Sequence, residues 1–431
     1  MYWLIRVKSR WQTVCLSLLT FPGLHAQRIA VSTIAVSPNR VMTDESASIR
    51  ATGLQPNERV TIRAELVDGA DAHWTAQADF AADSQGGIDT SRQPAVAGSY
   101  KEVSALGLIW SMMPDSRKAA RYQPPRNFGP QSIEFRLMRG NTQLAAATMQ
   151  QIPIAERVER VTLHDDALRG TLFLPPGNDR HPGVLVLGGS EGGMPLRRAA
   201  WLASHGFAAL ALAYFRYDDL PKELAGIPLE YFGQALNWMA HRPEIASDRI
   251  AVMGVSRGAE LALQLGSMYP MIKAVVAYAP ANARNPACCG FTSVPYAWTW
   301  NGAGLAFRPV RSMLSQSLEM RAVIDVQLTN GPILLISGDS DRIWPSSSMA
   351  DSIVARLKQF HFAHNVEHLK YPHAGHEAGR PEIVPAWQGE VTNPTSGREV
   401  EMGGTPKGNA ESSLDAIGRA IDFLQQSLAA H

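Results

Sequence analysis

The pattern of hydrophobic and polar positions changes near residue 156. Before that point, the chain contains short segments in which apolar and polar residues alternate or β-branched residues predominate. Turn-forming sequences such as Asp68-Gly69 separate these segments, and this arrangement is typical of an antiparallel β-sandwich. The predicted strands cover residues 29–36, 47–51, 59–66, 73–80 and 132–139.

After residue 156, continuous apolar segments alternate with amphipathic ones. Buried parallel strands give continuous apolar segments, and helices on the two faces of a sheet give amphipathic ones. This half is therefore predicted to be an α/β domain with a mostly parallel sheet. The predicted strands cover 161–174 (as a pair), 183–187, 207–213, 250–255, 272–278, 333–337 and 366–370, and the predicted helices cover 197–205, 229–241, 257–268, 346–360 and 414–429.

Two stretches interrupt this alternation. Residues 279–331 are rich in aromatic side chains and follow a predicted strand. Either they form an insertion that packs against the domain without a ligand role, or they form a lid that encloses an acyl group at the carboxyl end of the sheet. Residues 379–412 are rich in Gly, Pro, Thr and Asn, which predicts a surface loop.

The N-terminus has the order of features expected of a secretory signal peptide. Arg6, Lys8 and Arg10 precede a short apolar run at 11–21, and Ala26 is a small residue after it. Cleavage after Ala26 would leave a periplasmic or secreted protein; if this segment is instead an ordinary helix or a misassigned start, the protein is cytoplasmic. The predicted organisation is a signal peptide at 1–26, a β-sandwich at 27–155 and an α/β domain at 156–431.

Composition excludes several classes of protein. With 40 basic and 39 acidic residues the 431-residue chain has a net charge of +1, which argues against a nucleic-acid binder. No further segment reaches the roughly 18 apolar residues that a transmembrane helix needs. The three cysteines, Cys15, Cys288 and Cys289, are too few for a disulfide scaffold and have no zinc-site spacing. We expect Cys288 and Cys289 to be free, because neighbouring cysteines rarely bridge without strain, although an oxidising compartment permits a disulfide between them.

A G-x-S-x-G pentapeptide marks a candidate nucleophile. Ser256 lies between Gly254 and Gly258, after the predicted strand and before the helix-forming run that starts at Ala259. A sharp strand-to-helix turn of this kind exposes the serine hydroxyl above the sheet, and glycines relieve the crowding. The helix N-terminus also favours negative charge that develops there.

The same pentapeptide occurs a second time around Ser190. Here Met194 and Pro195 delay the next helix, so the turn is looser and Ser256 is the favoured nucleophile. The glycine-rich loop suits a second task, which is to present backbone N–H groups to an oxyanion. We therefore expect the oxyanion hole to be formed by the backbone N–H groups of Ser190 and Arg257.

A serine needs a general base, and in this kind of fold an acid and then a histidine follow it along the chain. Asp341 comes three residues after a strand-ending glycine, and Asp339 is the alternative acid. His376 follows the small pair Ala374-Gly375, which allows a loop to approach the serine closely, and His373 is the alternative base.

These residues together predict a serine hydrolase. His376 would take the Ser256 proton as the hydroxyl attacks a thioester or ester carbonyl, and Asp341 would orient the imidazolium. Water activated by the same histidine would then cleave the acyl-enzyme. The chemistry needs neither a metal nor an organic cofactor. The expected partner is a small acyl thioester or ester, with no nucleic acid involved.

Several segments resemble the family of acyl-CoA thioesterases and bile-acid-CoA:amino-acid N-acyltransferases. The similar segments are 107–112, 188–193, 206–214, 254–260 and 403–406. The resemblance covers nearly the whole mature chain, and it implies an α/β-hydrolase preceded by the family's N-terminal β-sandwich. It places the family's catalytic triad on Ser256, Asp341 and His376.

The resemblance also bears on the reaction. Members that conjugate amino acids use a cysteine nucleophile, so the serine here implies hydrolysis of acyl-CoA to free fatty acid and CoA rather than acyl transfer to an amine. The signal peptide favours a second hypothesis, an exported carboxylesterase or peptide-type hydrolase with the same triad. A third is a binding protein of the cell envelope with an inactive hydrolase half, but an intact triad argues against it.

Overall fold

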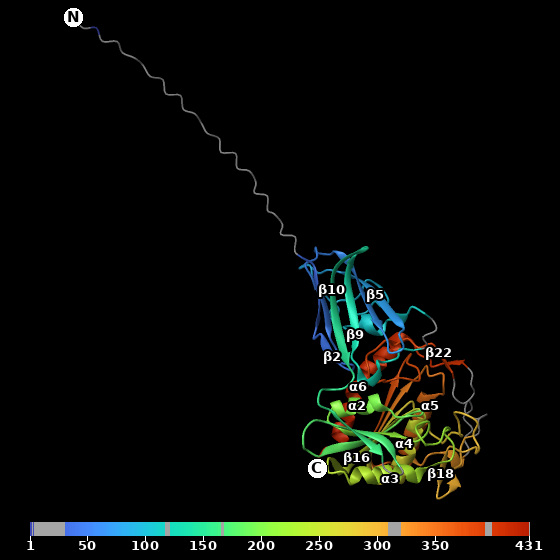
Figure 1. Ribbon diagram of the computed structural model, residues 1–431. Coiled ribbons are helices and arrows are strands. Elements are labelled where there is room, and N and C mark those ends of the chain that lie inside the picture. The colour runs from blue at the N-terminus through green and yellow to red at the C-terminus, as the bar shows by residue number, and fades with distance from the viewer. Residues whose placement is uncertain are drawn as a thin grey trace. The chain divides into compact units, whose positions relative to one another are not determined.

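The computed structural model of the chain describes Met1, Trp3 and residues 31–116, 121–164, 168–308, 320–392 and 399–430 (Figure 1). The chain divides into two compact units, Met1–Val31 and Ser32–His431. The predicted signal peptide, 1–26, lies outside the described residues apart from Met1 and Trp3, and both of these are exposed. Every helix and strand of the described residues belongs to the second unit.

The N-terminal half of this unit contains two β-sheets. Alternate residues of their strands are buried, as in β4, where Val60, Ile62, Ala64 and Leu66 face the core. Pairing is antiparallel throughout both sheets except between β2 and β10, which run parallel. One sheet has the order β1(Thr33–Ser37)-β3(Ser48–Thr52)-β6(Ile88–Asp89); the other has the order β2(Arg40–Met42)-β10(Thr142–Ile152)-β9(Gln131–Arg139)-β4(Arg59–Val67)-β5(His73–Ala81)-β7(Ala97–Gly98), and β8(Met113–Pro114) also pairs with β5.

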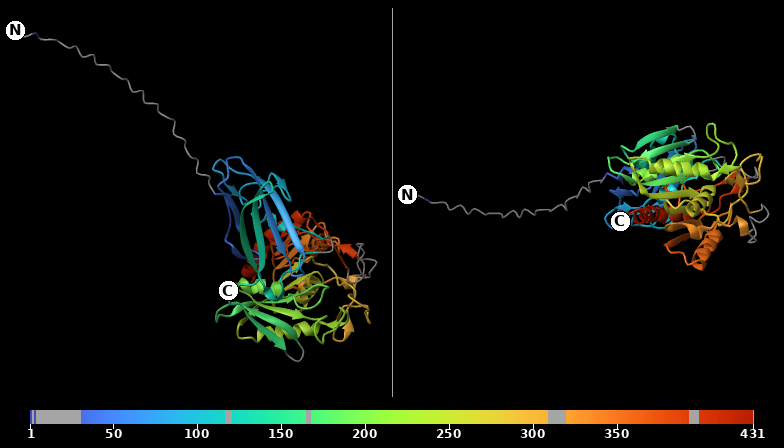
Figure 2. Two further views of the ribbon diagram at one scale, coloured as in Figure 1. Left: turned by 45° about the horizontal axis from the view of Figure 1, so that its top comes forward. Right: turned by 90° about the horizontal axis from the view of Figure 1, so that it is seen from below.

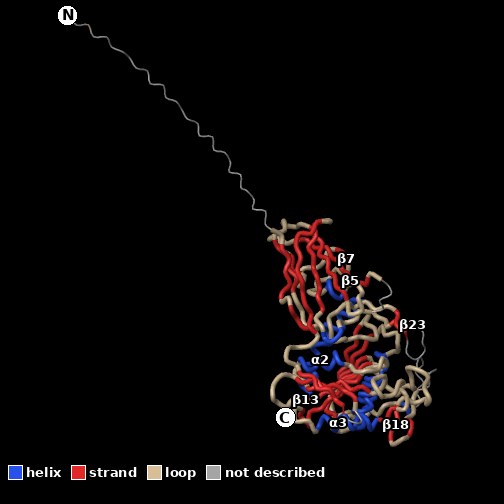
Figure 3. The backbone as a smooth tube through the Cα atoms, in the orientation of Figure 1, coloured by secondary structure: helices blue, strands red, loops and turns tan. Residues whose placement is uncertain are grey.

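The C-terminal half is built on an eight-stranded sheet. Its first three strands in spatial order pair antiparallel and the rest pair parallel, so the predicted mostly parallel sheet is confirmed. Figure 3 shows these strands gathered together with helices around them. The spatial order is β11(Glu159–His164)-β12(Arg169–Leu174)-β14(Ala208–Ala213)-β13(His181–Leu187)-β16(Ile245–Val255)-β17(Ile272–Tyr278)-β20(Ile333–Gly338)-β21(Val366–Tyr371).

Helices cover both faces of this sheet (Figure 2). The side chains of β16 divide between two hydrophobic clusters: Ala251 and Met253 join one, and Ile250 and Val252 join the other. The first cluster includes residues of α2(Leu196–Ser204) and α6(Pro406–Ser427), and the second includes residues of α3(Leu229–Ala240), α4(Arg257–Met268) and α5(Ser346–Gln359). The predicted α/β-hydrolase architecture follows from this two-sided burial. None of the described helices has the length and apolar character needed to cross a bilayer.

The two halves share one of these clusters. The cluster that contains α2 and α6 also contains core residues of the sandwich, among them Ile62 and Phe80. The short helix α1(Gly107–Trp110), which is buried throughout, contacts α6. The predicted boundary at 155/156 falls between β10 and β11, yet packing makes Ser32–His431 one compact body.

The segment predicted to be a surface loop at 379–412 is largely buried at its start. The Ile383 N–H donates to the Thr43 carbonyl oxygen at 2.7 Å, and the Ala386 N–H donates to the Trp110 carbonyl oxygen at 3.0 Å. These partners belong to the N-terminal half, and they satisfy backbone groups that water would otherwise have to satisfy. The prediction is therefore wrong for this part. The segment also contains the strand pair β22(Glu390–Thr392) and β23(Glu399–Glu401).

The last helix is longer than predicted. It begins at Pro406 rather than 414, because the Thr405 side chain accepts a hydrogen bond from the Gly408 N–H and proline occupies the first turn.

The aromatic stretch at 279–331 contains Trp298, which is 1% exposed. This burial favours a packed insertion rather than a lid at that residue. It belongs to β18(Trp298–Trp300), which pairs with β15(Ile227–Pro228) and β19(Ala303–Gly304), and the short helical turns η3(Met320–Ala322) and η4(Val326–Leu328) follow.

Neighbouring residues of β4 offer a test of the sandwich core. Leu66 is 4% exposed and Val67 is 45% exposed, so they lie on opposite faces of one strand. We expect Leu66→Ala to lower the free energy of unfolding by about 2–5 kcal/mol, because it removes buried volume. Val67→Ala should change it by less than about 0.5 kcal/mol. Denaturant unfolding measures both, and equal losses would contradict the assigned strand orientation.

Candidate active site

Ser256 lies at a sharp turn between β16 and α4. Its backbone has φ 56° and ψ −118°, which a residue with a side chain rarely adopts. Glycines make the turn possible: a Cβ on Gly254 would collide with the carbonyl oxygen of Gly258, and a Cβ on Gly258 would collide with that of Gly188. The serine hydroxyl is thereby held at the N-terminus of α4, above the carboxyl end of the sheet.

His376 reaches this hydroxyl from a loop that follows β21. Its Nε2 lies 2.9 Å from Ser256 Oγ. The loop is fixed by the His376 N–H, which donates to the Met402 carbonyl oxygen at 2.9 Å, and by the Gly375 N–H, which donates to Asn409 Oδ1 at 2.8 Å. A Cβ on Gly375 would collide with the Gly403 carbonyl oxygen, so the small residue before the histidine is required for this approach.

Asp341 lies on the other side of the imidazole. Its Oδ2 is 2.8 Å from His376 Nδ1 and accepts a hydrogen bond from Ser346 Oγ at 2.6 Å, while Oδ1 accepts from the Ile343 N–H at 2.9 Å. The carboxylate is fully buried. These hydrogen bonds satisfy the acceptor oxygens of a carboxylate that has no contact with water.

The alternative acid and base lie apart from this chain of hydrogen bonds. Asp339 Oδ1 accepts a hydrogen bond from the backbone N–H of His373 at 2.8 Å, and His373 is exposed. The structure therefore brings together Ser256, Asp341 and His376, and the His376 imidazole is hydrogen-bonded to Asp341 and Ser256.

The electrostatic surroundings raise the pKa of His376. Burial of the imidazole lowers this pKa, but the adjacent Asp341 carboxylate raises it through charge and hydrogen bonding, and the carboxylates of Glu377 and Glu191 raise it further. The net direction is upward from the usual value. The charged form of the His376 imidazole is thereby stabilised.

The loop that follows β13 borders the same hydroxyl. The Gly192 N–H donates to the Gly189 carbonyl oxygen at 3.3 Å, which closes a turn across Ser190 and Glu191 and leaves the Ser190 N–H outside that bond. Tyr214 Oη donates to the Gly188 carbonyl oxygen at 2.6 Å and anchors the loop. On the other side, Arg257 is the first residue of α4, so its N–H has no acceptor within the helix.

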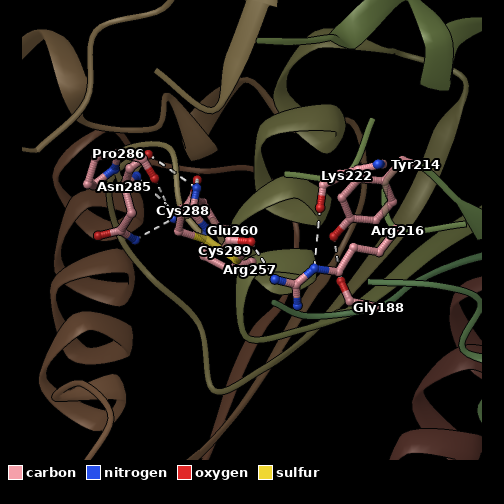
Figure 4. The surroundings of a disulfide bond; sticks show 10 residues. All are labelled: Gly188, Tyr214, Arg216, Lys222, Arg257, Glu260, Asn285, Pro286, Cys288 and Cys289. Carbon is pink, nitrogen blue, oxygen red and sulfur yellow. Dashed lines mark hydrogen bonds and ion pairs between the residues drawn. A yellow bond between two sulfur atoms is a disulfide. The ribbon is translucent and has the colours of Figure 1, made fainter. Parts of the chain in front are cut away.

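The Arg257 side chain enters a buried polar network (Figure 4). Its guanidinium donates to the Pro286 carbonyl oxygen at 2.8 Å and to the Asn285 carbonyl oxygen at 3.2 Å. Glu260, fully buried on the next turn of α4, accepts from Asn285 Nδ2 and Trp298 Nε1, each at 2.7 Å. These bonds fix the start of α4 against the aromatic stretch. The role of Glu260 was not predicted from the sequence. The available signal was an acidic residue in an otherwise apolar first turn of a helix.

Cys288 and Cys289 are joined in a disulfide next to this network (Figure 4). The expectation of two free thiols is therefore wrong. Cys289 has φ 78°, a left-handed conformation, and its carbonyl oxygen accepts a hydrogen bond from Arg216 Nη2, so the surrounding turn already holds the two residues in an unusual backbone conformation.

A second network lies next to His376 and was not predicted. Glu377 accepts a hydrogen bond from Arg121 Nη1 at 2.8 Å and from Gln388 Nε2 at 2.9 Å. Burial raises the pKa of Glu377, but Arg380 and Arg121 lower it, and the net direction is downward. Because Arg121 comes from the N-terminal half, that half contacts the residue directly after His376. No signal in a single sequence links residues 256 positions apart.

This arrangement has the parts needed for nucleophilic attack by an activated serine. A hydroxyl, an imidazole and a carboxylate form one chain of hydrogen bonds. Across the described ranges there is no cluster of three side chains able to hold a metal ion.

Comparison with known proteins matches both halves of the chain. The family model described as BAAT / Acyl-CoA thioester hydrolase C terminal matches residues 227–430, and that of the Acyl-CoA thioester hydrolase/BAAT N-terminal region matches 44–165. Acyl-coenzyme A thioesterase 6 of Mus musculus is 34% identical over 418 residues, which are 92% of this chain and 97% of that protein. Acyl-coenzyme A thioesterase 1 of Rattus norvegicus is 32% identical over 410 residues, with the same coverage. Among solved structures, the carboxylesterase EstE1 from a metagenomic library has a TM-score of 0.41 and 17% identity, covering 64% of this chain and 91% of its own.

Gly258 provides a test of the turn. We expect Gly258→Ala to lower the free energy of unfolding by about 2 kcal/mol or more, because the added Cβ has no room beside the Gly188 carbonyl oxygen. The control is Gly418→Ala in α6, where nothing lies within 4 Å of the added atom. It should stabilise the protein by about 0.5–1 kcal/mol through helix propensity. Thermal unfolding distinguishes the two, and an unchanged Gly258→Ala midpoint would contradict the close approach.

Proposed function

Because the chain belongs to the acyl-CoA thioester hydrolase/BAAT family, we propose that it hydrolyses acyl thioesters, with acyl-CoA as the substrate. The products are a free carboxylic acid and the thiol CoA. The observation that carries this proposal is the hydrogen-bonded chain Ser256–His376–Asp341 at a strained turn. The curated relatives, which bear the name acyl-coenzyme A thioesterase, support the choice of substrate.

The proposed reaction proceeds through an acyl-enzyme. Ser256 Oγ attacks the thioester carbonyl carbon while His376 Nε2 takes its proton, and Asp341 stabilises the imidazolium. The N–H groups of Ser190 and Arg257 stabilise the negative charge on the carbonyl oxygen. The C–S bond then breaks, and the imidazolium returns its proton to the leaving sulfur. Water, deprotonated by the same imidazole, attacks the acyl-serine ester and releases the acid.

The nucleophile supports hydrolysis rather than transfer to an amine. Family members that conjugate amino acids use cysteine, and this chain has Ser256 at that position. A serine ester that is positioned beside a general base can be cleaved by water that the base activates. Acyl transfer is therefore the less favoured reaction.

A second candidate function rests on the predicted signal peptide. We further propose that the protein is exported to the periplasm or beyond the cell. There the same residues would serve an exported carboxylesterase, with an ester in place of the thioester. Rates on a ladder of acyl-CoAs and on a p-nitrophenyl ester of the same chain length separate these functions, and detection of a mature chain that begins at residue 27 would support export.

Ser256→Ala tests the nucleophile against its rival. We expect kcat for acyl-CoA hydrolysis to fall by at least about 10³-fold, because no hydroxyl remains to attack. Ser190→Ala is the matched control, since it removes the competing hydroxyl but keeps the backbone N–H, and we expect it to retain activity within about tenfold. The reverse outcome would make Ser190 the nucleophile.

The raised pKa of His376 predicts the acid side of the pH profile. The reaction needs the neutral imidazole, so kcat/KM should fall as the pH drops through a value above the usual histidine pKa of about 6.5. Asp341→Asn should move that midpoint to lower pH and reduce kcat, because the main group that raises the pKa is removed. Asp339→Asn is the control and should leave the midpoint in place. An unchanged midpoint in Asp341→Asn would refute the assigned acid.

A further inference from the structure

We propose that Glu191 determines the charge preference of this site, and that its carboxylate disfavours acyl groups which carry a negative charge close to the thioester. The inference rests on the proposed function and names the substrate class more narrowly: neutral acyl thioesters rather than those of short dicarboxylic acids. It is carried by the position of one carboxylate beside the proposed nucleophile.

The backbone around Glu191 is held on both sides. The turn from Gly189 to Gly192 has Glu191 at one of its two corners. Before the turn, Tyr214 Oη bonds to the Gly188 carbonyl oxygen at 2.6 Å, and after it the Gly193 N–H donates to the Phe215 carbonyl oxygen at 3.0 Å. Glu191 therefore extends from a fixed loop rather than from a free one.

The carboxylate folds back toward Ser256 across Gly189. A Cβ on Gly189 would lie 2.8 Å from Glu191 Oε2 and 3.3 Å from Ser256 Cβ. The carboxylate and the hydroxyl-bearing carbon thus flank the same glycine. The Glu191 carboxylate also acts on the nearby imidazole. Burial lowers the pKa of His376, and Asp341, Glu377 and Glu191 raise it, in that order.

Glu191 is exposed, and within the part of the chain that the structure describes it forms no ion pair. Two arginines near the loop have other partners. Arg257 donates to the carbonyl oxygens of residues 285 and 286, and Arg197 pairs with Glu382 at 2.5 Å. Its carboxylate therefore lies beside Ser256 without an ion-pair partner among the described residues.

An acyl carbonyl carbon bound to Ser256 brings the next few carbons of its chain close to this carboxylate. A four-carbon diacid monothioester carries its own carboxylate within that reach, so two negative charges meet at a site that the substrate partly shields from water. At the effective dielectric constant near a protein surface, such a pair costs enough to reduce kcat/KM by about tenfold. A neutral chain of equal length bears no such cost.

Butyryl-CoA and succinyl-CoA provide the test, since their acyl groups have the same number of carbons and differ by one terminal carboxylate. The quantity to compare is the ratio of their kcat/KM values after subtraction of spontaneous hydrolysis. We expect the full-length protein to prefer butyryl-CoA, and Glu191→Gln to raise the succinyl-to-butyryl ratio by about tenfold while butyryl-CoA changes by less than about threefold. Glu156→Gln is the control: it makes the same change in net charge at a side chain that is 80% exposed, and the ratio should not change.

A second measurement needs no variant. Raising the salt concentration screens the repulsion, so the unmodified protein should lose part of its preference for butyryl-CoA; the charges of CoA itself cancel in the ratio. A ratio that responds neither to Glu191→Gln nor to salt overturns the inference. Absence of Ser256-dependent cleavage of both thioesters overturns the proposed function instead. In that case the ratio of kcat/KM values is measured with p-nitrophenyl hydrogen succinate and p-nitrophenyl butyrate. If Glu191→Gln leaves this ratio unchanged, the role of Glu191 is overturned.

Discussion

The close contact between the start of α4 and the loop after β13 determines the geometry of the whole site. Gly258 has to be a glycine because the Gly188 carbonyl oxygen occupies the space where a Cβ would lie. That contact sets Ser256 at the end of the central strand β16 and sets the Ser190–Glu191 turn beside it. A displaced loop would move Ser256, the Ser190 and Arg257 N–H groups and the Glu191 carboxylate relative to one another.

The surroundings of His376 show how the N-terminal half takes part in the site. Its sheets share a hydrophobic cluster with α2 and α6, and it supplies Arg121 to Glu377, the neighbour of His376. This ion pair is only partly buried, so it adds little net stability, but its hydrogen bond restricts the position of Glu377. The sandwich is thus a support for the histidine loop as well as a second core.

The architecture and much of the site could be predicted from the sequence, because both leave a pattern in residues that are close together along the chain. Apolar runs revealed the buried strands, and the glycines around Ser256 indicated the tight turn, so the α/β architecture and the residues brought together at the site were accessible. β10 was missed because its central alanines are partly exposed and give no alternation. Arg121, Glu377 and Glu191 were missed because their roles depend on contacts across the fold, and the buried loop at 379–386 was misread because its composition is that of exposed loops.

The backbone hydrogen bonds of Ile383 and Ala386 to the N-terminal half have a consequence for how such proteins can diversify. Because a loop of the C-terminal half is hydrogen-bonded to the N-terminal half, the two halves are not independent modules that can be separated between β10 and β11. Recombination there would separate Thr43 and Trp110 from their partners and would leave apolar surface of α2 and α6 uncovered. An unrelated sandwich in the same place would therefore have to re-create both the hydrogen bonds of this loop and the apolar cover of α2 and α6.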